Sequence, residues 1–443
     1  VLDLLHQKGC IVDFENERVR FPREIVEKTL LTVPRNIPLY QRDGNLAFIL
    51  GDGNCYCASG HNAVFVLEDE TGIRRNSTVQ DVKKFAILSD ALSDVDIVGV
   101  PVMPQDVTPQ TTLLYAVQTI LENSKKPIFF SSESEIINQA IIEMGKVIAG
   151  KESLNSCPLL ISQLSTTSPL YWEKGAIEAL YIVAQEGIPL DLLPQPIAGV
   201  TAPYTLSGLL TVHNTEVLSG IVISQLIHPG TPVIYGSAWT TYEMKLANVL
   251  IGRPECSLLR VAGAQMAHYY NIPSHTTAPD NDANLHDEQA AWEKMLSTIA
   301  GIIGANDMIV NLGMFGTGMT ISLEQLVMDN EMCRIVKRFH KGIEVNEDTL
   351  ALNTILQVGP RGEFLTTNHT LHHLRSGEHV PLEISNGENY EVWQLRGSKN
   401  ITEKAHDFIS SILLQGCQNP LSGEKKKEIQ SIINHYEKRM GLR

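Results

Sequence analysis

From Thr78 onward, apolar runs that read as strands alternate with segments that read as helices, and this alternation constrains the fold more than any other feature. Strands buried on both faces read as continuous apolar runs, and strand–helix alternation is typical of a parallel sheet. Eight such units close a (β/α)₈ barrel, so we predict a TIM barrel. The predicted strands lie at 96–104, 127–132, 158–165, 188–196, 231–239, 271–278, 307–315 and 362–370.

A doubly wound open sheet shows the same alternation, but it needs a point where the strand order reverses and usually has fewer strands. We therefore favour an α/β protein whose (β/α)₈ TIM barrel covers residues 79–393. Residues 1–78 contain short strand-like pieces between Gly, Asn and Asp turns, which predict a small α+β lobe. Residues 394–443 read as C-terminal helices packed on the barrel.

The formal net charge of −15 argues against a nucleic-acid partner, because phosphates would be repelled. The seven cysteines are scattered and mostly set among apolar residues, as expected for reduced thiols without a disulfide framework. No apolar run is read as long enough for a membrane helix, which needs about 20 residues. We expect a cytoplasmic protein with no membrane partner, and we leave a homo-oligomer open.

Three glycines, Gly313, Gly316 and Gly318, follow the seventh predicted strand and precede a helix. Ser322 and Gln325 have the spacing of a capping box, and Ile321 with Leu326 that of a hydrophobic staple. This glycine-rich loop should therefore lie at the C-terminal face, where barrel enzymes build their sites. A turn that needs positive φ and a nest for an anion both fit the pattern.

Three long segments resemble the trimethylamine:corrinoid methyltransferase family: "DLLPQPIAGVTAPYTLSGLLTVHNTEVLSGIVISQLIHPGTPVIYGS" at 191–237, "LVMDNEM" at 326–332 and "NHTLHHLRSGEHVPLE" at 368–383. The match extends to "FVLEDETGIRRNSTVQDV" at 65–82, so it covers nearly the whole chain. The resemblance implies a (β/α)₈ barrel that moves a methyl group from an amine nitrogen to the cobalt of a separate corrinoid protein. No tightly bound cofactor is then expected, because the corrinoid is carried by the partner.

The resemblance also implies a branch of that family. Its trimethylamine enzymes carry pyrrolysine in the glycine-rich segment, where this sequence has Met314, Phe315 and Gly316. The chain is thus similar to the branch without pyrrolysine, whose members resemble quaternary-amine methyltransferases with glycine betaine as the leading substrate. Proline betaine, carnitine and a non-catalytic amine-binding protein on the same barrel are the alternatives.

The chemistry explains how an enzyme of this branch can work without pyrrolysine. When a quaternary amine loses a methyl group, its nitrogen leaves as a neutral tertiary amine and needs no proton. Such a site must hold the substrate methyl group in line with the approaching cobalt, and it must surround the cation. Aromatic faces are suited to surround a cation. The aromatic and imidazole candidates stand at predicted strand ends: Tyr235, Trp239, Phe315 and His369. Phe315 and His369 are the preferred pair, since they end adjacent predicted strands.

A betaine carboxylate needs hydrogen-bond donors, and Gln163, Gln195, Ser237, His369 and the amides of the glycine-rich loop could supply them. Asp106, after the first predicted strand, could face the cation or cap the next helix. His369, His372 and His373 share a helix face and invite a zinc interpretation. We do not adopt it, because nothing marks further ligands with matching geometry, and we expect no metal.

Overall fold

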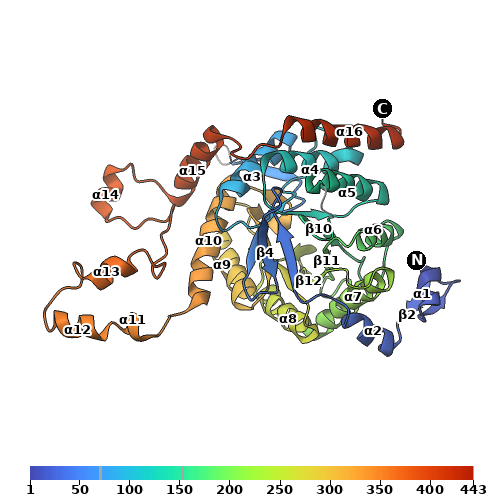
Figure 1. Ribbon diagram of the computed structural model, residues 1–443, viewed down its shortest axis with the longest axis horizontal. Helices are drawn as coiled ribbons and strands as arrows, with labels where there is room; N and C mark the ends of the chain where they lie inside the picture. The colour runs from blue at the N-terminus through green and yellow to red at the C-terminus, as the bar shows by residue number, and fades with distance from the viewer. Residues whose placement is uncertain (69–71, 151–153, 443) are drawn as a thin grey trace.

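The computed structural model describes residues 1–68, 72–150 and 154–442, and its centre is a closed barrel of eight parallel strands (Figure 1). In barrel order these are β5 (Tyr56–Ser59), β8 (Val98–Gly99), β9 (Ile128–Ser131), β10 (Leu160–Leu164), β11 (Leu190–Leu192), β12 (Val233–Ser237), β15 (Ser274–Thr277) and β16 (Met308–Leu312). A parallel bridge between Ala58 and Ile97 joins the first strand to the second and closes the ring. The predicted TIM barrel is confirmed.

Seven of the eight predicted strands are barrel strands, and the eighth prediction, at 362–370, is wrong. Its two large apolar side chains, Phe364 and Leu365, are exposed, and Thr367 caps the short helix α13 (Asn368–His373) by accepting the Thr370 amide. The missing strand is β5, which lies in the segment assigned to the N-terminal lobe. The division of the chain at residues 78 and 393 stays a prediction, although the barrel itself begins earlier.

Each barrel strand is followed by one helix of the outer ring. These helices are α3 (Val79–Ala91), α4 (Thr112–Asn123), α5 (Glu135–Ala149), α6 (Lys174–Gln185), α7 (Leu206–Ile227), α8 (Pro254–Tyr270), α9 (Glu288–Ile303) and α10 (Leu323–Lys341). Local signals start several of them: Thr78 and Asp81 form a reciprocal capping box on α3, and Ser322 accepts the Gln325 amide at the start of α10. The predicted cap at Ser322 is confirmed, but the Gln325 side chain bonds Asp329 instead of closing a box.

By length and composition, α7 is apolar enough to cross a membrane, and it is the one such helix among the described residues. This differs from the expectation that no apolar run is long enough. The helix packs against α6, α8, β11 and β12, so its apolar surface serves the barrel. Gly220 on α7 lies against Leu192 so closely that a Cβ atom would be 2.8 Å from that side chain.

The N-terminal end of the barrel is closed by a hairpin of β3 (Ile37–Tyr40) and β4 (Leu46–Leu50), seen in front of the barrel in Figure 1. Ile37, Leu39 and Leu50 form one buried cluster with inward residues of the barrel strands. The Tyr40 amide donates to the carbonyl oxygen of Pro158, just before β10. Access to the barrel interior is therefore left to the C-terminal end.

Smaller elements complete the body. A four-stranded sheet combines β6 (Phe65–Glu68) and β7 (Ile73–Asn76) with β17 (Met314–Phe315) and β18 (Thr320–Ile321), and the 3₁₀ turn η2 (Gly316–Gly318) joins the last two. The remaining elements before α10 are α1 (Leu2–Gln7), β1 (Ile11–Asp13), β2 (Arg18–Arg20), α2 (Arg23–Leu30), η1 (Pro109–Thr111), β13 (Thr241–Glu243) and β14 (Asn248–Leu250).

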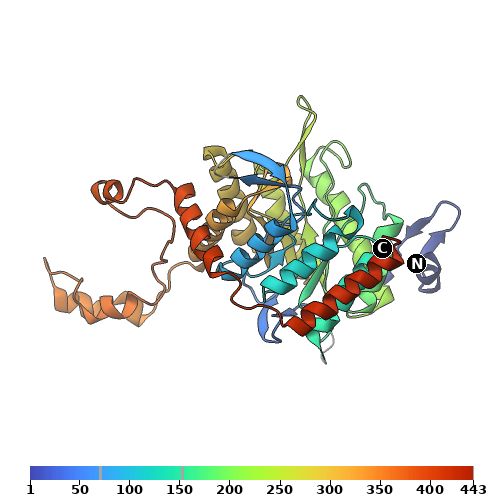
Figure 2. The same ribbon diagram turned by 90° about the horizontal axis from the view of Figure 1, so that it is seen from above.

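After α10 the chain leaves the barrel and returns. Residues 342–400, called the arm below, carry α11 (Glu347–Leu350), α12 (Leu352–Val358), α13 and α14 (Tyr390–Leu395). Residues 378–385 bond to α10 through Glu331 and Arg338, and the rest of the arm stands away from the body (Figures 1 and 2). The chain then returns as α15 (Ile401–Gln415), which packs on α10 and α3, and as α16 (Gly423–Arg439), which packs on α4 and α5.

Candidate active site

The interior of the barrel changes from apolar to polar toward its C-terminal end. Phe129 and Ile161 are paired on β9 and β10 and belong to the apolar interior cluster. Two residues further along each strand, Ser131 and Gln163 point to the same side, since side chains alternate across a strand. Asp191 is paired with both Gln163 and the interior residue Ile234, so it faces inward as well.

The same inward level continues on the next strands. His275 on β15 is paired with Gly236 on β12 and with the interior residue Met308 on β16. His61 and Asn62 follow the end of β5, and Asn311 lies at an irregularity in the pairing of β16 with β5, with a φ of 117°. Such irregularities re-aim a side chain. We call these seven residues the mouth layer: His61, Asn62, Ser131, Gln163, Asp191, His275 and Asn311.

One side of the mouth layer is a chain of hydrogen bonds. Asn62 Nδ2 donates to Ser131 Oγ at 2.5 Å, and Ser131 Oγ donates to Gln163 Oε1. Gln163 Nε2 then donates to Ser165 Oγ at 2.6 Å, which in turn donates to the Leu193 carbonyl oxygen. These links fix the positions of side chains on four segments of the barrel rim, those of β5, β9, β10 and β11.

The opposite side is built on a buried carboxylate–imidazole pair. Asp191 Oδ2 lies 3.0 Å from His275 Nδ1, and neither side chain has any solvent exposure. Gly236 sits between their strands because a Cβ atom there would be 2.5 Å from Asp191 Oδ1. Holding Nδ1 at the carboxylate leaves His275 Nε2 to face whatever occupies the barrel mouth.

A second buried ion pair supports the layer. Arg260 Nη2 lies 2.6 Å from Asp280 Oδ2, and the other oxygen of Asp280 accepts a hydrogen bond from Asn311 Nδ2 at 2.7 Å. Burial, together with the neighbouring His275, lowers the pKa of His61 to about 4 against the opposing effects of Asn311 and Asp280. His61 is therefore neutral at pH 7.

Five buried polar atoms of the mouth layer have no hydrogen-bond partner among the described residues. They are His61 Nδ1, Asn62 Oδ1, Asp191 Oδ1, His275 Nε2 and Asn311 Oδ1. A buried polar atom without a partner costs about 1–3 kcal/mol, so natural proteins leave few of them. Five such atoms at one level of one barrel indicate a site that a polar ligand completes.

Beneath this layer lies one aromatic ring. The ring of Phe129 makes an edge-to-face contact with the ring of His61, at a centroid distance of 5.0 Å, and another with the ring of His275, at 5.6 Å. The site thus combines an apolar floor, one carboxylate with a free oxygen and several neutral donors or acceptors. That combination suits a small ligand that carries both a cation and polar groups.

Comparison with known proteins identifies the family. The family model described as trimethylamine methyltransferase (MTTB) matches residues 1–441. This chain belongs to the MTTB family. It is 32% identical to trimethylamine methyltransferase MttB of Desulfitobacterium hafniense (strain DSM 10664 / DCB-2), over 100% of this chain and 89% of that relative. It is 31% identical to a glycine betaine methyltransferase of D. hafniense (strain Y51), over 99% and 91% of the two chains.

The barrel of this MTTB family member is also found among solved structures. It resembles the Methanosarcina barkeri monomethylamine methyltransferase (MtmB) with a TM-score of 0.54, covering 93% of this chain and 85% of that one. At 13% sequence identity, this likeness concerns the fold alone.

The residues predicted from sequence are not gathered in one place. Gln163 belongs to the mouth layer of this MTTB chain. Gln195 is exposed after β11, where its Nε2 donates to Thr240 Oγ1 at 2.8 Å. Asp106 is exposed as well and accepts the Val79 amide at the start of α3, so it caps a helix, although not the helix beginning near Pro109.

Three predicted residues on and after β12 face the helices. Tyr235 is fully buried and its hydroxyl donates to Asn214 on α7. The ring of Trp239 lies 4.3 Å from the ring of His213, also on α7, within the small core under α7 and α8. Ser237 donates to the His275 carbonyl oxygen. These side chains alternate away from the barrel interior, so the structure does not bring them to the mouth layer.

Phe315 lies on the short strand β17, where it is 1% exposed and packs with Leu67, Ala283 and Ala290. Lys294 Nζ lies 5.6 Å from the centroid of its ring. A protein cation thus already occupies the face expected to meet the substrate. The predicted pairing with His369 on an adjacent strand is wrong, because residue 369 is in α13 on the arm.

The glycine-rich loop is held by the protein itself. Gly313, Gly316 and Gly318 all have positive φ, as the turn interpretation requires. The Gly313 amide donates to Asp329 Oδ2, which is paired with Lys294 at 2.9 Å, and the Gly316 amide donates to the Ala283 carbonyl oxygen. These two amides therefore serve the fold, and they are not the open donors expected for a carboxylate.

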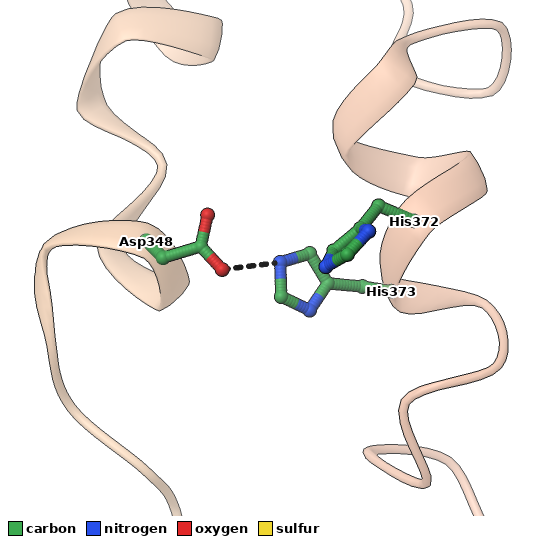
Figure 3. A group of neighbouring side chains, drawn as sticks. All are labelled: Asp348, His372 and His373. Atoms are coloured by element: carbon green, nitrogen blue, oxygen red, sulfur yellow. Dashed lines mark ion pairs between the residues drawn. The ribbon is translucent and has the colours of Figure 1, made fainter.

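The residues next to His369 form a group on the arm, in which His372 and His373 lie beside Asp348 (Figure 3). His373 Nε2 lies 3.2 Å from Asp348 Oδ2, and His369 Nε2 lies 3.2 Å from the Asp348 carbonyl oxygen. Together with His372, this is the one set among the described residues whose donor atoms could hold a metal ion, all lying within 4.8 Å of one another. It is remote from the mouth layer in the fold, and the expectation of a metal-free enzyme stays a prediction.

Proposed function

We propose that the protein transfers a methyl group from a small quaternary amine, glycine betaine in the first place, to the Co(I) corrinoid of a separate partner protein. Family membership supports the reaction class, and one of the similar relatives is a glycine betaine methyltransferase. The sequence has Met314, Phe315 and Gly316 in its glycine-rich loop, without the pyrrolysine that the family resemblance associates with trimethylamine.

The mouth layer offers what a quaternary amine needs. A trimethylammonium group cannot donate a hydrogen bond, so it is held by charge and by walls that exclude water. The free Oδ1 of Asp191 supplies a buried negative charge, and Phe129 supplies an apolar floor. The tertiary amine that leaves is neutral and needs no proton, so the site needs no general acid.

The carboxylate end of a betaine would be met by imidazole. His275 Nε2 and His61 Nδ1 are both buried without partners, and neutral His61 can donate from one ring nitrogen only. Asp191 holds the ring of His275 through Nδ1, so that an Nε2–H of His275 would donate to the substrate carboxylate. In this arrangement Asp191 and His275 act together on the two ends of one substrate.

The fold also supports one direction of transfer. The β3–β4 hairpin closes the N-terminal end of the barrel, so the methyl group must be presented toward the C-terminal end. An in-line displacement requires the acceptor to approach on the side opposite the leaving nitrogen. The partner corrinoid protein would accordingly dock over the strand ends that carry the mouth layer.

The decisive experiment is a substrate screen. Purified protein is mixed with a Co(I) corrinoid protein and glycine betaine, proline betaine, carnitine, choline or trimethylamine, and methyl-cobalt formation is followed by absorbance. Glycine betaine or a close relative is expected to react and trimethylamine is not. Robust turnover of trimethylamine would contradict the substrate assignment.

The second candidate is a non-catalytic binder of quaternary amines on the same barrel, which the site geometry alone does not separate from an enzyme. Calorimetric binding of glycine betaine without any change in the cobalt spectrum would favour it. Binding of no quaternary amine would contradict both candidates.

A further inference from the structure

The arm has almost no core of its own. Within residues 342–400 a single side chain, Ile384, is buried. Its four helices are each shorter than eight residues, and isolated helices of that length are marginal in water. A segment of this kind needs a surface from elsewhere to hold its structure.

Many large apolar side chains of the arm face solvent instead. They are Ile343, Val345, Leu350, Leu352, Ile355, Leu356, Phe364, Leu365, Leu371, Leu374, Leu382, Tyr390 and Leu395. At about 100 Å² for each side chain, they offer on the order of 1,000 Å² of apolar surface. A stable protein–protein interface buries about 800 Å² on each partner, so the arm alone is large enough to form one.

A second unpartnered apolar surface lies on the barrel itself. Along α9, Trp292, Leu296, Ile299 and Ile303 are exposed at spacings of four, three and four residues, which places them in one stripe. The exposed residues of α9 beyond its first turn include no charged side chain. An outer helix of a barrel normally turns a charged face to water, so this stripe marks a contact surface.

The stripe and the arm lie next to each other. Helix α9 packs against α10, and the arm begins where α10 ends. Outer helices of a TIM barrel run in the same direction, so Ile303 at the end of α9 lies on the side from which the arm departs. The arm nevertheless leaves the stripe of its own barrel uncovered, as the 63% exposure of Trp292 shows.

We propose that the arm docks on the α9 stripe of a second copy of this chain, and that the two copies exchange arms across a two-fold axis. A two-fold contact is self-complementary: each copy supplies one arm and one stripe, so both unpartnered surfaces are covered at once. The surface is apolar and extensive, as in obligate homodimers. A corrinoid protein that must dissociate in every catalytic cycle does not suit a segment that depends on its partner to stay folded.

The test compares three variants of the full chain by light scattering after size-exclusion chromatography. Trp292→Glu places a charge in the stripe, and Leu356→Glu places one on the arm, where this leucine is 79% exposed. Leu31→Glu is the matched control, because Leu31 is 87% exposed at the end of α2, on the side opposite the arm in Figure 1. The wild type and the control are expected to be dimers at micromolar concentration, and both interface variants to dissociate at least 30-fold more readily.

Hydrogen exchange gives an independent reading on the wild-type chain. Amides of α9 and of the arm should become protected together as the protein concentration rises. If either charged variant does not fold, Trp292→Ala and Leu356→Ala replace them, with a weaker shift in the same direction. A monomeric wild type, a dimer that survives both substitutions, or protection that appears only after a corrinoid protein is added would each overturn the proposal.

Discussion

The mouth layer and the arm are both incomplete, but in opposite ways. The mouth layer is buried and polar, and it leaves five donor or acceptor atoms without partners. The arm is exposed and apolar, and it leaves its hydrophobic side chains in water. Unpartnered buried polar atoms point to a small polar ligand, whereas an unpartnered apolar face of this size points to another protein.

Substitutions in the mouth layer and substitutions on the arm should therefore change different properties of the protein. Changes in the mouth layer should alter methyl transfer while the oligomeric state is kept, and changes on the stripe or the arm should do the reverse.

Asp191→Asn should reduce the rate of methyl transfer by roughly 100-fold or more, because it removes the buried negative charge and the strong acceptor for His275. Hydrogen bonds to charged groups contribute about 1.5–3 kcal/mol, and the lost attraction to the substrate cation adds to this. Single-turnover formation of methyl-cobalt measures the rate. Asp348→Asn on the arm is the matched control and should keep it, so equal losses in both variants would count against the mouth layer as the site.

Acid should destabilise the protein below about pH 6.5, because buried neutral histidines resist protonation in the folded state. Burial lowers the pKa of His61 to about 4 and that of fully buried His213 to about 3, whereas an unfolded histidine titrates near 6.5. Between pH 6.5 and about 4 the unfolded chain binds more protons. Each ring therefore removes up to about 1.4 kcal/mol of unfolding free energy for each pH unit of acidification.

Urea unfolding at several pH values measures this slope. His61→Asn should make the slope shallower by the share of one ring. His340→Asn changes an exposed ring of α10 and should keep the wild-type slope. An unchanged slope in the His61 variant would show that its ring is as well hydrated in the folded chain as in the unfolded one.

His275→Gln should weaken the binding of glycine betaine by about 10-fold and that of choline, which lacks the carboxylate, by much less. The expected loss corresponds to one hydrogen bond to a charged group, about 1.5 kcal/mol. Calorimetric titration of both ligands measures the difference. Equal loss of affinity for glycine betaine and for choline would show that His275 contacts the cationic end of the substrate or only supports the packing of the site.

The sequence was sufficient for the barrel and insufficient for most of the site, and the residues show why. Continuous apolar runs predict buried strands, and seven of the eight barrel strands are runs of this kind. The remaining barrel strand, β5, reads as a strand-like piece, "CYCASG", but its short length and the turns around it place it in the N-terminal lobe. The run at 362–370 reads as a strand by composition, but its apolar side chains Phe364 and Leu365 are exposed on the arm.

The site depends on which way each side chain points, and strand-end position alone does not give that. Tyr235 and Ser237 end the correct strand but alternate toward α7 and α8. One usable signal was present: Asp191 is a charged residue inside the apolar run "IPLDLLPQP", where a buried strand has no reason to carry one. The pairing of Asp191 with His275 joins residues 84 positions apart and requires the folded barrel.

Removal of metal ions should have the smallest effect of all. The one described group that could hold an ion, Asp348 with His372 and His373, lies on the arm, while every residue assigned here to the substrate lies in the barrel mouth. Dialysis against a chelator should therefore leave the initial rate of methyl-cobalt formation within about twofold of its starting value. The cobalt displaces a neutral tertiary amine from the methyl carbon, and this step needs neither a Lewis acid nor a metal-bound water. The assay must use a corrinoid protein that was reduced beforehand, so that loss of a reductant is not read as loss of enzyme activity. Elemental analysis before and after dialysis completes the measurement. A stoichiometric metal whose loss abolishes transfer, and whose return restores it, would move the active site from the mouth layer to the arm.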